Sequence, residues 1–157
     1  MPVLIGEAKV AGPDNVVYTI GLGSCVAVVL YELDQRVGGI AHAMLPMPAN
    51  GRRNTPVARF ASSAVPTLLD LMLEAGADAA RVQARLAGGA SMFETLLSET
   101  GRRLGLRNVE AARAALEQHR IPIVGEDVGG SHGRSVYLHT TDGRLTITSV
   151  AHPDVHL

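Results

Sequence analysis

The chain has 157 residues, of which 46% are hydrophobic and 18% charged, and its net charge is −1. This length suits one domain with its own core, so we expect a single domain over residues 1–157. The near-neutral charge excludes the overall basic field typical of nucleic-acid-binding proteins. The single cysteine excludes an internal disulfide, and the sequence shows neither a signal peptide nor an apolar run long enough to cross a membrane. We therefore expect a cytoplasmic protein without membrane insertion.

The first part of the chain predicts strands. Residues 2–10 and 16–20 are rich in β-formers and are separated by turn-forming residues. Residues 24–32 are apolar at both parities, which predicts a central strand covered on both faces. A turn over residues 33–36 leads into a second apolar run over residues 37–45. These two runs predict an antiparallel hairpin.

Two segments predict helices. Thr55 and Pro56 have the chemistry of a helix start, and apolar residues at helical spacing continue towards Gly76. Pro66 lies inside this pattern and predicts a kink or a break, because proline lacks an N–H and collides with the preceding turn. Residues 108–120 are rich in Ala, Glu and Arg with one apolar stripe, so they predict a second helix on the sheet.

The remaining segments predict further strands. Residues 81–93 indicate a short strand that runs into a glycine turn, and residues 121–130 indicate a strand followed by a glycine-rich loop. Residues 134–150 form the clearest hairpin, with two β-rich runs joined through Asp142 and Gly143. The sequence therefore predicts a mixed α/β fold that contains antiparallel hairpins and two main helices.

The only cysteine, Cys25, lies at the start of the predicted central strand. A free thiol needs a base within hydrogen-bond reach to act as a nucleophile at neutral pH. A turn centred between Leu33 and Asp34 places His42 directly opposite Cys25, with both side chains on one face of the sheet. A slip of two residues keeps that face, whereas a slip of one residue moves His42 to the other face.

Thr19 precedes Cys25, and its hydroxyl could accept a hydrogen bond from the imidazole, as the third member of a catalytic triad does. Gly21 and Gly23 would let a substrate approach the backbone closely. The alternative is that Cys25 and His42 are ordinary core residues, because free cysteine is among the most buried residue types. The spacing of the residues alone favours this alternative.

Other motifs are weak. Residues 21–26 lack the third glycine of a dinucleotide-binding loop and lead into a strand, and the later glycine-rich turns lack the Lys-Ser/Thr pair of a phosphate loop. His152 and His156 flank a proline, which excludes a regular helix that would hold them as a metal pair. Glu126 and Asp127 are adjacent and would diverge on a strand. We therefore expect no metal, no cofactor and no paired-carboxylate mechanism.

Five blocks of the sequence occur in an order and spacing that resembles the chemoreceptor glutamine deamidase family, CheD. They are TIGLGSCVAV (19–28), GIAHAMLP (39–46), LAGGASMF (86–93), GLRNVEA (105–111) and GEDVGGSHGRSV (125–136). The resemblance extends over nearly the whole chain. It implies a layered α/β sandwich, in agreement with the fold class predicted from the residues.

The resemblance also implies an activity, namely hydrolysis of glutamine side-chain amides to glutamate on methyl-accepting chemotaxis receptors through a cysteine thioester. It places the nucleophile on Cys25, the histidine on His42 and the orienting threonine on Thr19. We add Gly23 and Ser24, whose backbone N–H groups are candidates for oxyanion stabilisation and substrate binding. A CheC-type chemotaxis phosphatase is the further partner that the resemblance implies.

Two other functions stay open at this point. One is a regulatory binding module for a CheC-type phosphatase, and the other is a cysteine amidohydrolase with another protein substrate. For an enzyme that acts on receptors, we expect the loop over residues 46–55, with Arg52 and Arg53, to form one wall of a receptor-binding groove, unless it is simply a solvated loop. Met92 and Phe93 are candidates for a second wall, with a core position favoured for Phe93.

Overall fold

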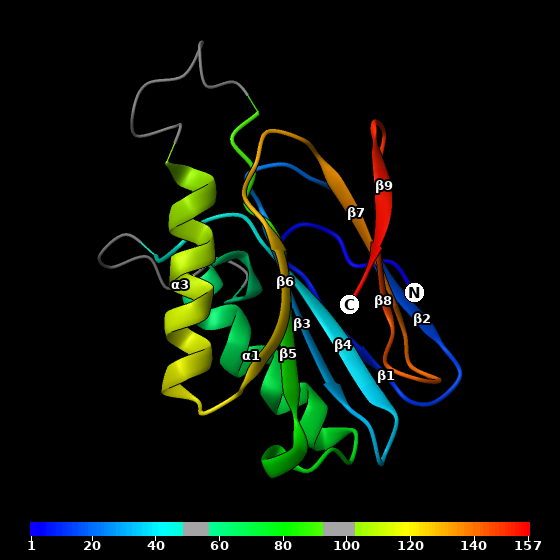
Figure 1. Ribbon diagram of the computed structural model, residues 1–157. Coiled ribbons are helices and arrows are strands. Elements are labelled where there is room, and N and C mark those ends of the chain that lie inside the picture. The colour runs from blue at the N-terminus through cyan, green and yellow to red at the C-terminus, as the bar shows by residue number, and fades with distance from the viewer. Residues whose placement is uncertain (49–56, 93–102) are drawn as a thin grey trace.

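The computed structural model describes residues 1–48, 57–92 and 103–157. Figure 1 shows these residues in three layers, with two α-helices on one side, a five-stranded sheet in the middle and a four-stranded sheet on the other side. The mixed α/β architecture predicted from the sequence is confirmed. No helix among the described residues is both long enough and apolar enough to cross a membrane.

The five-stranded sheet has the order β1-β4-β3-β5-β6. Its central strand, β3 (Val26–Glu32), is buried at every residue and pairs antiparallel with β4 (Val37–Ala43) and β5 (Gln83–Gly88). At the edges, β1 (Ala8–Ala11) pairs antiparallel with β4, and β6 (Ile123–Val128) pairs parallel with β5. The prediction of a central strand covered on both faces is confirmed, because both neighbouring layers pack on β3.

The four-stranded sheet is antiparallel throughout and has the order β2-β7-β8-β9. It contains β2 (Val16–Leu22), the predicted hairpin of β7 (Arg134–His139) and β8 (Leu145–Ser149), and the edge strand β9 (His152–His156). The sequence reasoning missed β9. Every residue of β9 is exposed, so the strand carries none of the apolar alternation by which the other strands were found.

Helix α1 (Ala61–Glu74) begins later than predicted. A single 3-10 turn, η1 (Val57–Arg59), precedes it, and Thr55 and Pro56 lie outside the described residues. The predicted break at Pro66 is wrong, because the helix continues through this residue with buried side chains on both sides of it. These core contacts outweigh the loss of one backbone hydrogen bond. The helix ends as predicted, just before Gly76, which has a φ of 100°.

Helix α3 (Leu104–Gln118) begins before the predicted residue 108 and ends close to the predicted end. Both α-helices cover one face of the five-stranded sheet, where they pack on Val26, Val28 and Leu30 of β3. The alternate residues Ala27, Val29 and Tyr31 contact the four-stranded sheet instead. Cys25 has the same parity as this second set and packs against the core between the two sheets.

Candidate active site

The predicted pairing of Cys25 with His42 is wrong by one two-residue step. The structure pairs Ala27 with His42. The ladder between β3 and β4 ends at the pair Val26 and Ala43, so Cys25 lies one residue beyond it. The turn closes with Glu32 opposite Val37, so its centre lies one residue later than predicted. Because successive side chains alternate between faces, Cys25 and His42 still face the same side of the sheet.

Thr19 holds one nitrogen of the His42 ring. Its Oγ1 lies 2.7 Å from His42 Nδ1 and 2.7 Å from the carbonyl oxygen of Val3. Thr19 and His42 are each only 2% exposed. A carbonyl oxygen can only accept, so the hydroxyl donates its hydrogen to Val3 and accepts one from the imidazole. We infer that Nδ1 carries the ring hydrogen and that Nε2 carries the lone pair.

The other ring nitrogen of His42, Nε2, is buried and has no hydrogen-bond partner among the described residues. Buried polar atoms without partners are uncommon in native proteins because each one destabilises the fold. Burial also lowers the pKa of His42, so the ring is uncharged at neutral pH. Nε2 is therefore a basic nitrogen without a hydrogen-bond partner among the described residues, on the face of the sheet that also carries Cys25.

Cys25 is partly exposed, in contrast to the buried ring of His42. Burial of much of the side chain raises the pKa of the Cys25 thiol, and its own backbone N–H acts in the opposite direction. The thiol is therefore protonated at neutral pH, and a thiolate forms only if a base accepts its proton. Sγ and His42 Nε2 form no hydrogen bond with each other in this structure.

The backbone of residues 23–25 is held by the turn that follows β5. The N–H of Gly89 donates to the Cys25 carbonyl at 2.8 Å, and the N–H of Ala90 donates to the Gly23 carbonyl at 2.8 Å. A Cβ at Gly88 would collide with the Cys25 carbonyl oxygen, so a larger residue would push the turn away. The sequence reasoning predicted only a tight turn here, whereas the structure shows that the turn fixes the cysteine segment.

Asn108 of α3 is a further contact that the sequence reasoning missed. Its Nδ2 donates to the carbonyl oxygens of Ser24 at 2.8 Å and Met44 at 3.0 Å. The side chain is fully buried. The sequence predicts only that a helix begins at Asn108, far along the chain from Ser24 and Met44, so only the tertiary structure reveals this contact.

Gly21 and Gly23 differ in what their surroundings require of the residue. Gly21 has a φ of 74° and lies at the irregularity in the β2–β7 pairing, where a residue with a side chain would be strained. Gly23 packs closely against Met92, since a Cβ there would lie 3.1 Å from the sulfur of Met92 and would require a small shift of that side chain. The roles of Gly23 and Ser24 in oxyanion stabilisation stay predictions.

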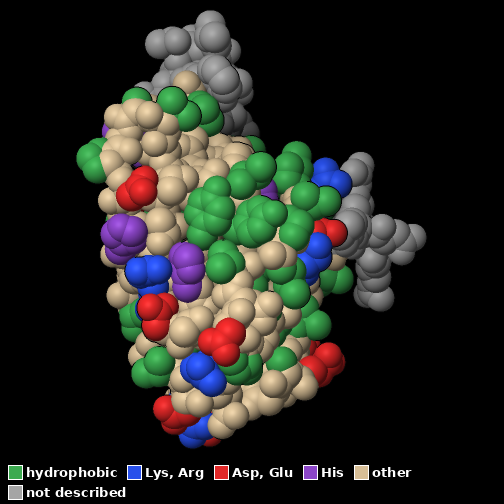
Figure 2. All heavy atoms as spheres, turned by 90° about the vertical axis from the view of Figure 1, so that its right-hand side faces the viewer, with side chains coloured by type: hydrophobic (Ala, Val, Ile, Leu, Met, Phe, Trp, Pro, Cys, Tyr) green, Lys and Arg blue, Asp and Glu red, His purple; other side chains and the backbone are tan. Residues whose placement is uncertain are grey.

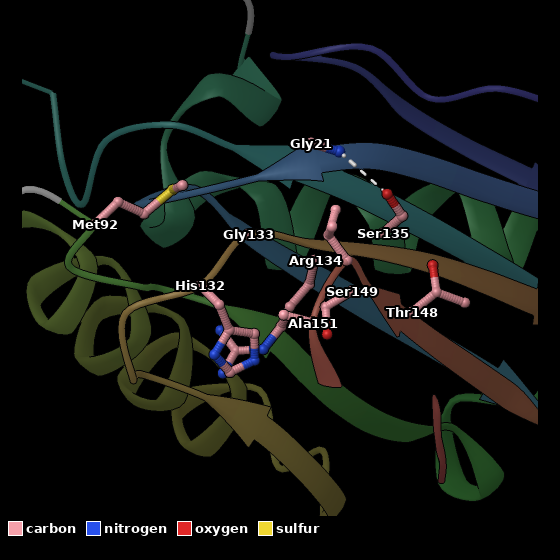
Figure 3. Close-up of a pocket in the computed structure, with 10 residues that line it drawn as sticks. Gly21, Met92, His132, Gly133, Arg134, Ser135, Thr148, Ser149 and Ala151 are labelled. Carbon is pink, nitrogen blue, oxygen red and sulfur yellow. Dashed lines mark hydrogen bonds between the residues drawn. The ribbon is translucent and has the colours of Figure 1, made fainter. Parts of the chain in front are cut away.

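A cavity of about 630 Å³ opens beside this region (Figure 3). Gly21 and Met92 form one side of it, and His132, Arg134 and the turn between β8 and β9 form the other. Met92 is 44% exposed, which agrees with a surface position rather than a core position for this side chain. Because Met92 also lies against Gly23, the cavity adjoins the segment that carries Cys25.

The outer face of the four-stranded sheet carries an apolar patch. Tyr18 of β2 and Tyr137 of β7 stack with ring centroids 5.7 Å apart, and Ile20 of β2 is strongly exposed. Figure 2 shows hydrophobic side chains gathered on this side of the molecule. Tyr18 and Ile20 lie on the same strand as Thr19, but on the opposite face of the four-stranded sheet.

The other predicted walls of a receptor groove fall on residues that the structure does not describe. Arg52, Arg53 and Phe93 all lie outside the described residues. In the described ranges, no group of three or more His, Cys, Asp or Glu side chains could hold a metal ion.

Comparison with known proteins identifies the family. The family model described as CheD chemotactic sensory transduction matches residues 44–149. The chain belongs to the CheD family. This match begins just after His42, so the roles of Thr19, Cys25 and His42 rest on their geometry and on the resemblance of the sequence blocks.

Curated CheD relatives cover almost the whole chain. "Probable chemoreceptor glutamine deamidase CheD" of Archaeoglobus fulgidus is 44% identical over 143 residues, which are 91% of this chain and 88% of the relative. "Probable chemoreceptor glutamine deamidase CheD 2" of Geobacter metallireducens is 42% identical over 95% of this chain and 93% of its own length. "Chemoreceptor glutamine deamidase CheD" of Halalkalibacterium halodurans is 40% identical over 93% of this chain and 91% of its own length.

Proposed function

We propose that this CheD protein deamidates specific glutamines of methyl-accepting chemotaxis receptors, with Cys25 as the nucleophile and His42 as the base. The names of its CheD relatives support the reaction and the substrate. One structural observation carries the assignment of residues: the unpartnered Nε2 of His42 lies on the face of the sheet that also carries Cys25. Thr19 holds the ring in the tautomer that a base requires.

The reaction starts when a glutamine carboxamide reaches Cys25. His42 Nε2 accepts the thiol proton, and the thiolate attacks the carboxamide carbon. The protonated ring then donates a proton to the leaving ammonia, and a thioester remains on Cys25. Water loses a proton to His42 and attacks the thioester carbon. The C–S bond then breaks, glutamate leaves, and His42 returns its proton to the Cys25 sulfur, which restores the thiol. The sum of these steps consumes one water and forms glutamate and ammonia.

The surroundings of Cys25 have two further roles in this proposal. Backbone N–H groups of Gly23 and Ser24 stabilise the oxyanion that forms during each attack, which is typically a contribution of about 3 kcal/mol per donor. The Thr19 hydroxyl accepts the Nδ1 hydrogen throughout and stabilises the ring while it is positively charged.

We place this activity in the cytoplasm and in one CheD domain over residues 1–157. Pairing with a CheC-type phosphatase stays a prediction from the resemblance. If the chain acts only as a binding module for such a phosphatase, the geometry around His42 Nε2 has no chemical role. An amidohydrolase with another protein substrate would use the same residues on a different target.

The test is incubation of the protein with cytoplasmic fragments of the receptors from the same organism, followed by mass spectrometry of the peptides. We expect conversion of particular glutamines to glutamate by the wild type and none by Cys25→Ser, a variant of similar size with a weaker nucleophile. Intact glutamines with the wild-type protein would contradict the proposed substrate. Equal conversion by both proteins would contradict the proposed nucleophile.

A further inference from the structure

Asn108 connects the strand that leads to His42 with the segment that carries Cys25. Its Nδ2 group donates one hydrogen to the Ser24 carbonyl at 2.8 Å and the other to the Met44 carbonyl at 3.0 Å. Ser24 directly precedes Cys25, and Met44 follows His42 by two positions. One fully buried amide therefore spans the two backbones.

This bridge forms just beyond the end of the β3–β4 ladder. The β3–β4 ladder ends at the pair Val26 and Ala43. Beyond this pair, the N–H groups of Met44 and Leu45 both donate to the Arg59 carbonyl, at 2.8 and 3.1 Å, so the Leu45 N–H does not bond to the Ser24 carbonyl across the hairpin. Asn108 thus lies just beyond the last rung and supplies hydrogen-bond donors to the Ser24 and Met44 carbonyls.

We propose that Asn108 is a positioning residue, which fixes the separation of Cys25 and His42 by joining the open ends of β3 and β4. As a claim about catalysis, this rests on the proposed deamidase function. As a claim about the geometry of the Cys25 thiol, it can be tested without any substrate.

The contact also sets the orientation of one peptide group. In a trans peptide, the C=O of one residue and the N–H of the next point in opposite directions. Because Asn108 holds the Ser24 carbonyl, the N–H of Cys25 points away from α3. This N–H favours the thiolate of Cys25 and lowers its pKa, against the effect of burial. Loss of the Asn108 amide therefore removes a constraint on the group that stabilises the thiolate.

A second contact holds α3 in place independently of Asn108. A Cβ at Gly105 would lie 2.6 Å from the carbonyl oxygen of Ala90, so the helix backbone packs directly on the turn after β5. Buried residues along the helix, including Leu116, pack against the sheet. We therefore expect α3 to keep its position when the side chain of Asn108 is shortened.

The experiment compares Asn108→Ala with Leu116→Ala, a core substitution on the same helix. The first measurement is the pH dependence of Cys25 alkylation by iodoacetamide, which reports the pKa of the only thiol. We expect the Asn108→Ala profile to move to higher pH, and the Leu116→Ala profile to match the wild type. The second measurement is steady-state deamidation, where Asn108→Ala should lower kcat by about 10- to 100-fold with little change in KM.

Each outcome decides one claim. If Asn108→Ala folds and matches Leu116→Ala in both measurements, the positioning role is wrong. If the wild type does not deamidate receptors but the alkylation profile still moves, the proposed function is wrong and the role of Asn108 in placing Cys25 stands. If Asn108→Ala does not fold, NMR of the wild type decides: we expect slow solvent exchange of both Asn108 side-chain amide hydrogens, and fast exchange would overturn the proposal.

Discussion

The β3–β4 hairpin carries one buried polar side chain at each end, and the two differ in how their hydrogen bonds are satisfied. Glu32 lies beside the turn and is 0% exposed, and His42 lies towards the open end and is 2% exposed. Burial alone does not distinguish them. The difference lies in their partners.

Glu32 is held by partners on both carboxylate oxygens. Oε1 accepts from the N–H of Asp34 at 2.8 Å and from Arg81 Nε at 3.3 Å, and Oε2 accepts from the N–H of Asp78 at 3.4 Å. Burial raises the pKa of Glu32, but these donors together outweigh burial and lower it. At this end of the hairpin, the hydrogen bonds of the Glu32 carboxylate are satisfied, and they link the turn to the segment before β5.

Only one of the two ring nitrogens of His42 has a hydrogen-bond partner among the described residues. Nδ1 is bonded to Thr19, and Nε2 is buried without a partner among the described residues. Unmet hydrogen-bonding capacity, rather than burial, therefore marks the end of the hairpin where we propose chemistry.

Replacement of Cys25 should have the largest effect on activity. Cys25→Ser and Cys25→Ala remove the thiolate, so we expect deamidation to fall by about 10⁴-fold or more, as for other covalent nucleophiles. Ammonia release from receptor fragments measures this loss. The thermal unfolding midpoint should change little because the side chain is only partly buried. Residual activity within tenfold of the wild type, roughly 1.4 kcal/mol, would contradict the role of the thiol.

Removal of the Thr19 hydroxyl should have the next largest effect. Thr19→Val removes the acceptor of the Nδ1 hydrogen, so the ring can adopt the tautomer that is not a base at Nε2. We expect kcat to fall by about 10- to 100-fold, less than for loss of the carboxylate of a catalytic triad.

Thr140→Val is the matched control for Thr19. Thr140 is a buried threonine that likewise donates to a carbonyl, that of Gly12 at 2.7 Å, and it lies away from His42. We expect a similar loss of stability and an unchanged kcat. Equal losses of kcat in the two variants would show that the effect of Thr19→Val is only a general loss of stability.

The pH dependence of kcat/KM should have a broad plateau. In the reactive state, one proton is carried by either the Cys25 sulfur or His42 Nε2. Activity therefore falls when both atoms carry a proton and when neither does. Burial lowers the pKa of His42 and raises the pKa of Cys25. We therefore expect the acid limb below the ordinary histidine pKa of about 6.5 and the alkaline limb above the ordinary thiol pKa of about 8.5. A narrow optimum between these values would contradict the assignment.

Substitution at the other end of the hairpin should affect stability and leave activity unchanged. Glu32→Gln removes the negative charge of the carboxylate that accepts these hydrogen bonds. We expect a loss of about 1–3 kcal/mol in the free energy of unfolding at neutral pH. The pKa of Glu32 is lowered by folding, so its contribution is present above the unfolded glutamate pKa and is lost as the pH falls through the folded value.

Urea unfolding of Glu32→Gln and the wild type at neutral and acidic pH measures this contribution, and the two curves should approach each other in acid. The deamidation rate of the folded variant is the second readout. A large loss of activity in Glu32→Gln would remove the contrast between the two ends.

The sequence predicted the hairpin because two strand-like apolar runs flank a turn, and alternation fixes only which residues within one strand share a face. It did not fix the register, which depends on the geometry of the turn, so the predicted partner of Cys25 was wrong by a two-residue step while the face was right. Asn108 was missed because its contacts join segments far apart in the chain. Strand β9 was missed because it is exposed throughout.

The contact between Thr19 and His42 depends on the packing of the two sheets against each other. Thr19 belongs to the four-stranded sheet and His42 to the five-stranded sheet, and no periodicity in the sequence indicates how two sheets align. The residues alone favour core positions for Cys25 and His42, whereas the resemblance of five sequence blocks implies a catalytic role. The unpartnered Nε2 supports that role on independent, physical grounds.

The most direct test of the central claim is to trap the thioester on Cys25. Deamidation of receptor fragments is run with hydroxylamine in the buffer, because this nucleophile competes with water for a thioester and converts the glutamine into a glutamyl hydroxamate that mass spectrometry distinguishes from glutamate. We predict hydroxamate and glutamate at the same positions with the wild type and neither product with Cys25→Ser. Glutamate without hydroxamate, formed equally by the two proteins, would contradict a covalent mechanism at Cys25.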